Sequence, residues 1–282
     1  MNEGTLSIRT DGAIMHVSIN NPPVNLMTIQ MVKELFGLVG RLNFDSSIKV
    51  VIFESAISEF FIAHFDLNDL LVAADDPAAK GKFDDINILQ SLSVGLQSVP
   101  QVTIAKVGGV CRGAGLELIL GMSMRFAGAS ARFCAPEASS DFLPCGGGST
   151  RLAMACGPAR ALEITLSARD FSGEEAQQYG IVNRVLPDNE LHTYVETLAQ
   201  RIAQRSQHTI AINREVIKRT FAAMADALFD GFAYENDAWR ASMQQPEMSR
   251  SIHALLQTGQ TRESELDLPR TMDGILESLS AK

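Results

Sequence analysis

Residues 109–137 constrain the fold and the chemistry of this chain more than any other stretch. The run reads GVCRGAGLELILGMSMRFAGASARFCAPE and follows an apolar, strand-like segment, Val102–Val110. Gly113, Ala114 and Gly115 then form a small-residue turn, and a helical pattern follows at once. Small residues let a ligand approach the backbone, and the first N–H groups of a helix have no intrahelical partner. The run therefore predicts a strand, a tight turn and a helix start that suits a negatively charged oxygen.

Two glutamates flank this predicted oxygen site. Glu117 falls in the first turn of the predicted helix, and Glu137 lies twenty residues further on. That interval leaves room for the helix and for a returning extended segment, so both carboxyl groups could face one anion pocket. Spacing alone leaves their role open, because a glutamate near a helix start is often only matched to the helix dipole.

Three sequence runs occur together in the order and spacing of a known superfamily. They are VGGVCRGAGLEL, RFCAPEASSDFLPCGGGSTRL and ALEITLSARDFSGEEAQQYGIVNRVL, and they resemble the enoyl-CoA hydratase/isomerase (crotonase) superfamily. The similarity runs from about Leu6 to about Leu186 and is strongest from Gly109 to Val185. The resemblance implies an α/β fold with an acyl-CoA site: a spiral of β-β-α turns over residues 1–205. A C-terminal helical region, residues 206–282, would pack subunits into homotrimers or hexamers.

The resemblance also implies roles for particular residues. The two hydratase glutamates map onto Glu117, for activation of water, and Glu137, for delivery of a proton. The oxyanion hole, made of backbone N–H groups, maps onto Phe65 and Ala114. Phe65 and the preceding His64 are much bulkier than the usual small residues, and Ala114 stands at the usual glycine. Any residue except proline can donate a backbone N–H, so these departures alter the expected pocket shape and leave the donors in place.

Three further residues are candidates for the substrate pocket. His64 could be an extra acid or base, or a histidine that only packs. Residues 139–141, Ser-Ser-Asp, replace an apolar run near the acyl pocket, so Asp141 suggests a polar or unusual acyl group. Cys145 replaces a glycine in the same region, and its thiolate could attack substrate if it is exposed. The alternative is a buried, inert thiol, which is also the expectation for the other three cysteines.

Local patterns predict several elements around this central run. Alternation, turn signals and helical spacing indicate a hairpin over Leu6–Ile19 that turns at Asp11-Gly12, a helix over Thr28–Leu42, a buried strand over Lys49–Glu54, a surface loop over residues 72–85, a helix over Ile86–Val99 and a capping box at Ser172–Glu175. A helical pattern continues from Leu191. The run GQTRESELDLPRTM, beyond Pro246, matches no family pattern.

Composition narrows the partners. With 282 residues and 46% apolar content, the chain can bury a sizeable core. A net charge of −9 argues against broad binding to nucleic acid or to an anionic membrane, although local Lys or Arg would have to meet the phosphates of CoA. No run resembles a membrane span or a signal peptide, so we expect a cytoplasmic protein. The cysteines show no C-x-x-C pair and no histidine cluster, so neither a metal site nor a cofactor beyond the CoA of the substrate is expected.

Three functions compete at this point. The first is hydration of a 2-enoyl-CoA to the 3-hydroxyacyl-CoA. The second is 3,2-enoyl-CoA isomerisation, as in relatives that rely chiefly on the residue corresponding to Glu137, or another acyl-CoA reaction of the superfamily. The third is an acyl-CoA-binding protein without catalysis. The presence of Glu117 favours hydration, because this reaction needs both a base for water and an acid for the α-carbon.

Overall fold

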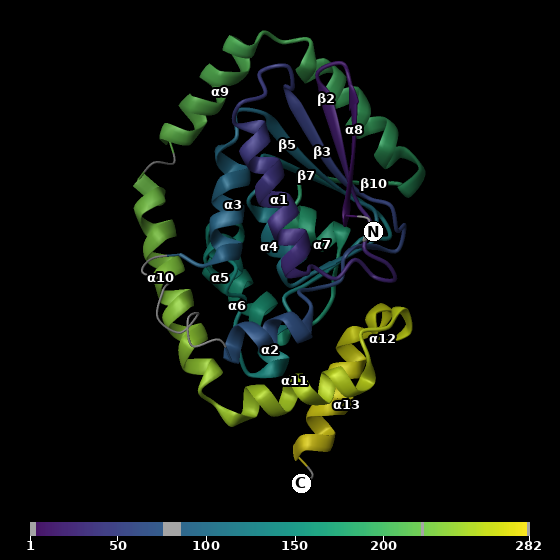
Figure 1. The fold of residues 1–282 in the computed structure, drawn as a ribbon, viewed down its shortest axis with the longest axis vertical. Helices are drawn as coiled ribbons and strands as arrows, with labels where there is room; N and C mark the ends of the chain where they lie inside the picture. Colours follow the sequence, from purple (N-terminus) through teal and green to yellow (C-terminus); the bar gives the residue numbers. More distant parts are fainter. Residues whose placement is uncertain (1–3, 76–85, 221–222, 281–282) are drawn as a thin grey trace.

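The computed structural model describes residues 4–75, 86–220 and 223–280. Two sheets lie in the middle of the molecule and helices surround them (Figure 1). The six-stranded sheet has the order β1 (Leu6–Asp11), β2 (Ile14–Ile19), β3 (Val50–Ser55), β5 (Val102–Val107), β7 (Met124–Gly128), β10 (Arg184–Leu186). The four-stranded sheet has the order β4 (Phe60–Ile62), β6 (Val110–Arg112), β8 (Arg132–Cys134), β9 (Phe171–Ser172).

The N-terminal hairpin is confirmed, with its turn one residue later than predicted. Strands β1 and β2 pair antiparallel, and Asp11 lies opposite Ile14. Gly12 and Ala13 therefore form the two-residue turn. Gly12 has a φ of 54°, a conformation that glycine adopts without a steric cost. All other pairings in the six-stranded sheet are parallel.

The apolar run predicted as one strand, Val102–Val110, is divided between the two sheets. Its first part is β5 in the large sheet, and its last residue begins β6 in the small sheet. Gly109 lies at the crossing, where an added Cβ would come within 2.3 Å of the Glu59 carbonyl oxygen. The backbone there packs too closely to leave room for a side chain. At this point the chain passes from the six-stranded sheet to the four-stranded sheet. This crossing carries the chain toward Gly113 and the helix that follows it.

Helices cover both faces of the large sheet. The face that belongs to the main core packs against α1 (Ile29–Leu42), α3 (Ile88–Ser98) and α4 (Ala114–Leu120). The opposite face packs against α8 (Asp188–Ala203) and against Ile210 of α9 (Gln207–Thr220). The predicted first helix is confirmed with Thr28 as its N-cap, and α3 begins at a capping box formed by Asn87 and Gln90.

The remaining core elements are short. They are α2 (Leu67–Asp75), η1 (a 3-10 helix, Glu137–Ser140), α5 (Gly148–Cys156), α6 (Pro158–Ser167) and α7 (Gly173–Gln178). The predicted capping box at Ser172 and Glu175 is confirmed and opens α7. The predicted loop over residues 72–85 is wrong for residues 72–75, which form the end of α2. The apolar helical spacing that begins at Leu67 continues into these residues. The rest of that prediction lies outside the described residues.

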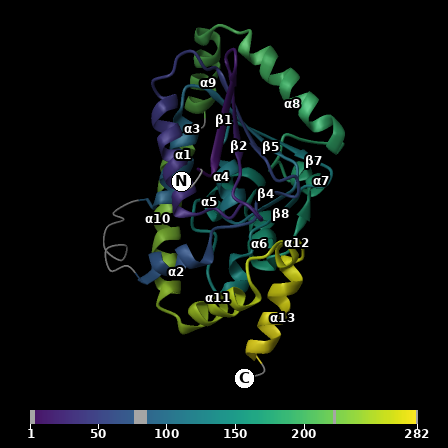
Figure 2. The same ribbon diagram turned by 45° about the vertical axis from the view of Figure 1, so that its right-hand side comes forward.

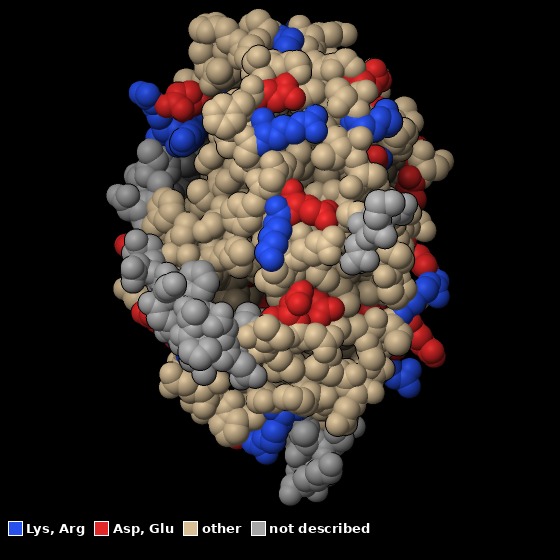
Figure 3. Space-filling view, viewed as in Figure 1, with Lys and Arg blue, Asp and Glu red and all other residues tan. Residues whose placement is uncertain are grey.

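The C-terminal helices wrap the edge of the core and return to its lower end. In Figures 1 and 2, α10 (Ala223–Met243) descends along the outside, and α11 (Pro246–Thr258), α12 (Arg262–Leu266) and α13 (Leu268–Ser280) turn beneath the core. They contact α5, α2 and η1. The mixed α/β core and the C-terminal helices agree with the expected fold class, whereas the domain boundary at residue 205 stays a prediction. Lys and Arg are interspersed with Asp and Glu on the face that Figure 3 shows.

Candidate active site

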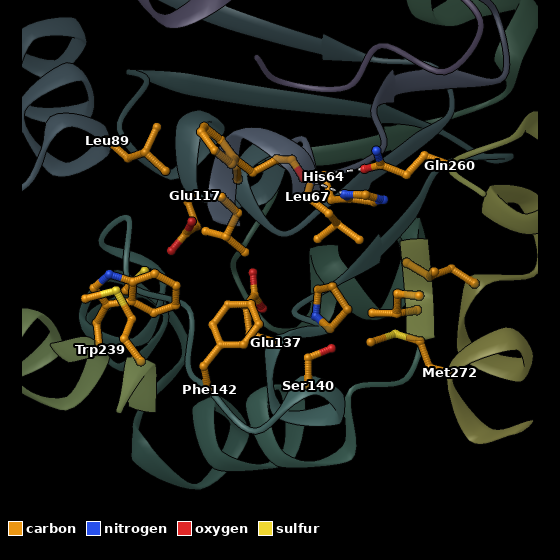
Figure 4. Close-up of a pocket in the computed structure, with 18 of the residues that line it drawn as sticks. His64, Leu67, Leu89, Glu117, Glu137, Ser140, Phe142, Trp239, Gln260 and Met272 are labelled. Atoms are coloured by element: carbon orange, nitrogen blue, oxygen red, sulfur yellow. Dashed lines mark hydrogen bonds between the residues drawn. The ribbon is translucent and has the colours of Figure 1, made fainter. Parts of the chain in front are cut away.

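A cavity of about 190 Å³ lies between the core and the C-terminal helices. Core residues and C-terminal residues face each other across it (Figure 4). Phe142 and Trp239 form one wall as an edge-to-face pair whose ring centroids are 5.2 Å apart. Most of the remaining lining is apolar and includes Leu67, Leu89, Leu255, Leu268 and Met272. An apolar cavity with few polar groups is typical of a small-molecule site and suits an acyl chain.

Glu117 is held by the backbone turn that precedes α5. Its Oε1 accepts the N–H of Gly146 at 2.7 Å and the N–H of Gly148 at 2.9 Å. A Cβ added at Gly146 or Gly148 would come within 2.6 or 2.7 Å of a Glu117 carboxyl oxygen, so both donors have to be glycine. Burial, followed by the charges of Glu137 and Glu235, raises the pKa of Glu117 well above its ordinary value, and the two amides oppose that rise.

Glu137 begins η1 and points into the same cavity (Figure 4). Its side chain is buried, and within the described ranges its Oε2 has no hydrogen-bond partner. Burial raises the pKa of Glu137 to about 7, and the charge of His64 opposes the rise. Gly113, with a φ of 47°, packs against it: a Cβ there would come within 3.0 Å of Glu137 Oε1 and 3.5 Å of His64 Cβ.

The two carboxyl groups differ in their hydrogen bonds, and this decides which one keeps a shared proton. Two backbone N–H groups stabilise the ionised form of Glu117. Burial raises the pKa of both carboxyl groups, and that of Glu117 rises further. Within the described ranges, Glu137 Oε2 has no hydrogen-bond partner. Because Glu117 and Glu137 repel each other when both are charged, the pair favours one ionised and one protonated group. The hydrogen bonds from Gly146 and Gly148 favour the charge on Glu117.

Both residues of the predicted oxyanion hole line this cavity. Phe65 forms a parallel bridge with Met27, in which the Met27 N–H donates to the His64 carbonyl at 2.8 Å and the Asp66 N–H donates to the Met27 carbonyl at 2.9 Å. In that pattern the N–H of Phe65 points away from Met27. Ala114 opens α4, so its N–H has no intrahelical acceptor. Across the described part of the chain, neither N–H donates to a protein acceptor. The oxyanion hole itself stays a prediction.

His64 lines the cavity and does more than pack. Its Nδ1 lies 2.7 Å from the Phe65 carbonyl oxygen, and its Nε2 lies 3.0 Å from Glu265 Oε1. Burial opposes the charged ring, but the Glu265 carboxylate and the Phe65 carbonyl outweigh burial and raise the pKa of His64. The raised pKa favours the charged form of the imidazole, whose charge acts on Glu137.

The structure corrects one pocket residue and one proposed reactivity. Asp141 is exposed, does not line the cavity and is 3.3 Å from the Ser251 hydroxyl that donates to it. Its left-handed backbone, with a φ of 62°, ends η1 and turns the side chain outward, whereas the buried Ser140 lines the cavity. Cys145 does line the cavity, but burial and the charge of Glu117 raise the pKa of its thiol well above the ordinary value. A reactive Cys145 thiolate is therefore disfavoured.

Two buried glutamates were not predicted from the sequence. Glu235, on α10, accepts from the N–H groups of Gly147 at 2.9 Å and Thr150 at 2.7 Å, and it raises the pKa of Glu117. Glu265, on α12, lines the cavity. The position of Glu235 inside an aromatic-rich run is a sequence signal that could have marked it as buried. No local pattern marked Glu265, because its partner His64 is 201 residues away.

Two other features, a metal site and a membrane span, are absent from the described residues. No three His, Cys, Asp or Glu side chains there are grouped so that they could hold a metal ion. None of the helices described is both long enough and apolar enough to cross a membrane.

Comparison with known proteins agrees with the geometry. The family model for enoyl-CoA hydratase/isomerase matches residues 9–263. The Mycobacterium tuberculosis protein "Probable enoyl-CoA hydratase echA8" is 27% identical over 261 residues, which cover 90% of this chain and 95% of that protein. The carnitinyl-CoA dehydratase of Proteus mirabilis is 28% identical over 219 residues, which cover 77% and 81% of the two chains.

A solved structure shows the same fold. A Streptomyces avermitilis protein, provisionally named an enoyl-CoA hydratase, superposes with a TM-score of 0.87 at 35% identity and covers 97% of this chain and 99% of its own. The crotonase-like fold predicted from the sequence is thus confirmed. On the match of the family model, together with this structure, the chain belongs to the enoyl-CoA hydratase/isomerase family.

Proposed function

We propose that this protein is an enoyl-CoA hydratase, which adds water across the 2,3 double bond of a 2-enoyl-CoA. One observation carries the proposal: the buried carboxyl groups of Glu117 and Glu137 face one apolar cavity and differ in their hydrogen bonds. Glu117 accepts two backbone N–H groups, whereas Glu137 Oε2 has no partner among the described residues. Hydration needs a base and an acid at the same time. The names of the relatives, hydratases and a dehydratase of acyl-CoA thioesters, agree with this reaction class.

In the proposed reaction, Glu117 and Glu137 act on opposite ends of the double bond. The ionised Glu117 takes a proton from water as the water oxygen bonds to the β-carbon. The π electrons of the double bond move toward the thioester carbonyl, and the protonated Glu137 then gives its proton to the α-carbon. The product gains one water in total, and the proton left on Glu117 passes to Glu137 or to solvent before the next cycle.

The thioester oxygen gains negative charge during this reaction. We place it against the N–H groups of Phe65 and Ala114, which line the cavity and donate to no acceptor in the described parts of the protein. Loss of one such donor typically costs about 3 kcal/mol in the transition state. The wall formed by Phe142 and Trp239 would receive the acyl chain.

A panel of acyl-CoA thioesters tests the proposal and separates it from its two rivals. Hydration consumes the absorbance of the conjugated thioester and yields a 3-hydroxyacyl-CoA, whereas isomerisation of a 3-enoyl-CoA creates that absorbance. Calorimetry with the same thioesters measures binding. We expect hydration of at least one 2-enoyl-CoA. Binding without turnover across the panel would instead support a non-catalytic acyl-CoA-binding protein.

Gly148→Ala should weaken hydration although the substituted residue never touches the substrate. Its new Cβ would come within 2.6 Å of Pro144 Cβ and 2.7 Å of Glu117 Oε1, so the carboxylate has to move. A misplacement of about 1 Å can cost a hundredfold in rate, so we expect kcat/KM to fall about that far. Gly37→Ala is the matched control, because nothing lies within 4 Å of its added Cβ. Equal activity of G148A and G37A would contradict the role given to Glu117.

We also propose the homotrimer or hexamer that the resemblance implies. Large apolar side chains are exposed on two helices: Leu162 and Leu166 of α6, and Val216 and Ile217 of α9. Where such side chains form a contiguous patch, the patch often marks a contact between proteins. Light scattering should give three or six times the chain mass of 30.6 kDa, and Val216→Glu should lower it. A single-chain mass for the unmodified protein would contradict the assembly.

A further inference from the structure

The C-terminal helix α12 is anchored to the strand that leads into the site. Arg112, the last residue of β6, is fully buried and binds Asp170 through two hydrogen bonds of 2.7 Å. Its third hydrogen bond goes from Nη1 to the backbone carbonyl of Glu265. Nearby, Gln260 Oε1 accepts the N–H of Leu67 at 3.1 Å (Figure 4). The segment that carries Glu265 is thereby held against both β6 and the stretch that follows Phe65.

Glu265 presents its carboxylate to His64 inside the cavity wall. Glu265 is 2% exposed and His64 is 8% exposed, and Glu265 Oε1 lies 3.0 Å from His64 Nε2. The Phe65 carbonyl, 2.7 Å from Nδ1, can only accept, so Nδ1 carries a proton. A carboxylate opposite Nε2 favours a proton on that nitrogen as well. The geometry points to an imidazolium paired with a carboxylate.

His64 in turn fixes the peptide groups around the proposed oxyanion donor. The Phe65 carbonyl is bonded to the His64 ring, and the His64 carbonyl accepts the N–H of Met27. The imidazole thus holds the Phe65–Asp66 peptide, and Met27 holds the His64–Phe65 peptide, which carries the Phe65 N–H. Together these two contacts set the direction of that N–H. The position of the imidazole depends on Glu265, which belongs to the part of the chain that matched no family pattern.

We propose that Glu265 and His64 form a positioning dyad, which orients the Phe65 N–H and holds a positive charge beside the thioester oxygen. The proposal rests on the hydratase function proposed above and extends the active site into the C-terminal helices. Three charged groups from separate elements face His64: Glu265 of α12, Arg112 of β6 and Glu137 of η1. Of these three charged groups, Glu265 is the one with a hydrogen bond to the His64 ring, so Glu265 favours the charged form of His64 most directly.

Glu265→Gln separates charge from shape. The glutamine amide can donate an N–H to Nε2, so the ring keeps both hydrogen bonds while it loses its charge. We expect kcat to fall about tenfold with KM little changed, because the lost charge acts mainly on the oxyanion of the transition state. The charge of His64 lowers the pKa of Glu137, so its loss should also move the alkaline limb of kcat/KM to higher pH. A purely structural role would leave the alkaline limb in place.

Three companion variants make the test decisive. Glu263→Gln is the matched control, since Glu263 is an exposed residue on the same helix. If the dyad acts as one unit, the double variant H64Q/E265Q loses no more activity than H64Q alone. Wild-type kcat and an unshifted limb in E265Q would overturn the proposal, as would additive losses in the double variant.

Nitrogen NMR of the full-length, ¹⁵N-histidine-labelled protein tests the dyad without any activity. The signal that disappears in H64Q identifies His64 among the five histidines. At pH 7 we expect both ring nitrogens of His64 to be protonated in the wild type and only one in E265Q. A neutral His64 in the wild type would overturn the dyad, even if hydration is observed. If no thioester turns over but His64 is charged, the proposed function fails and the ion pair stands.

Discussion

Glu117→Gln should reduce hydration of a 2-enoyl-CoA by about a thousandfold, within the range that general acid–base catalysis contributes. The glutamine oxygen can still accept the N–H groups of Gly146 and Gly148, so the turn before α5 keeps its shape. What the variant lacks is an oxygen that can take a proton from water. The measurement is the initial rate of loss of the conjugated thioester absorbance, with thermal unfolding to show that the variant is folded.

The matched control for this variant is Glu190→Gln, an exposed residue of α8 in the same chemical class. It should hydrate at the wild-type rate. Hydration by E117Q at the wild-type rate would remove Glu117 from the mechanism. If E117Q loses hydration but still converts a 3-enoyl-CoA to the 2-enoyl isomer, Glu137 alone supports isomerisation, and the second candidate function gains.

Glu137→Gln should lower the rates of hydration and of isomerisation by about a thousandfold each. Both reactions move a proton at the α-carbon, and Glu137 is the group proposed to carry it. The amide of glutamine cannot transfer that proton. A rate loss confined to one of the two reactions would contradict this role, because the proton transfer is common to both.

The pH dependence of kcat/KM should identify the protonated form of Glu137 as the active one. Burial raises the pKa of Glu137 to about 7. The acid is present below that value and is lost as pH rises through it, so kcat/KM should fall on the alkaline side of about pH 7. On the acid side, protonation of Glu117 removes the base, so the profile should be bell-shaped, with apparent values that belong to the pair. An activity that rises steadily above pH 7 would contradict these roles.

Local sequence patterns were sufficient for most of the core. The hairpin of β1 and β2, helix α1 and the capping box at Ser172 follow from alternation, helical spacing and turn chemistry among residues close in sequence. The same patterns failed at Gly109, where one apolar run is divided between two sheets. Periodicity indicates which residues are buried, whereas the passage from one sheet to the other at Gly109 involves the close approach of Glu59, in the turn before β4.

The sequence by itself determined the family, the fold class and the two glutamates that face the cavity, because these follow from motifs whose residues lie within a short stretch. Only the tertiary structure decided which groups surround them. It turned Asp141 outward, gave Glu117 two glycine N–H groups and brought Glu265 to His64. The reason is physical: burial and charge act through space, and the pKa values in this site are set by groups from β6, η1, α5, α10 and α12, which only folding brings together.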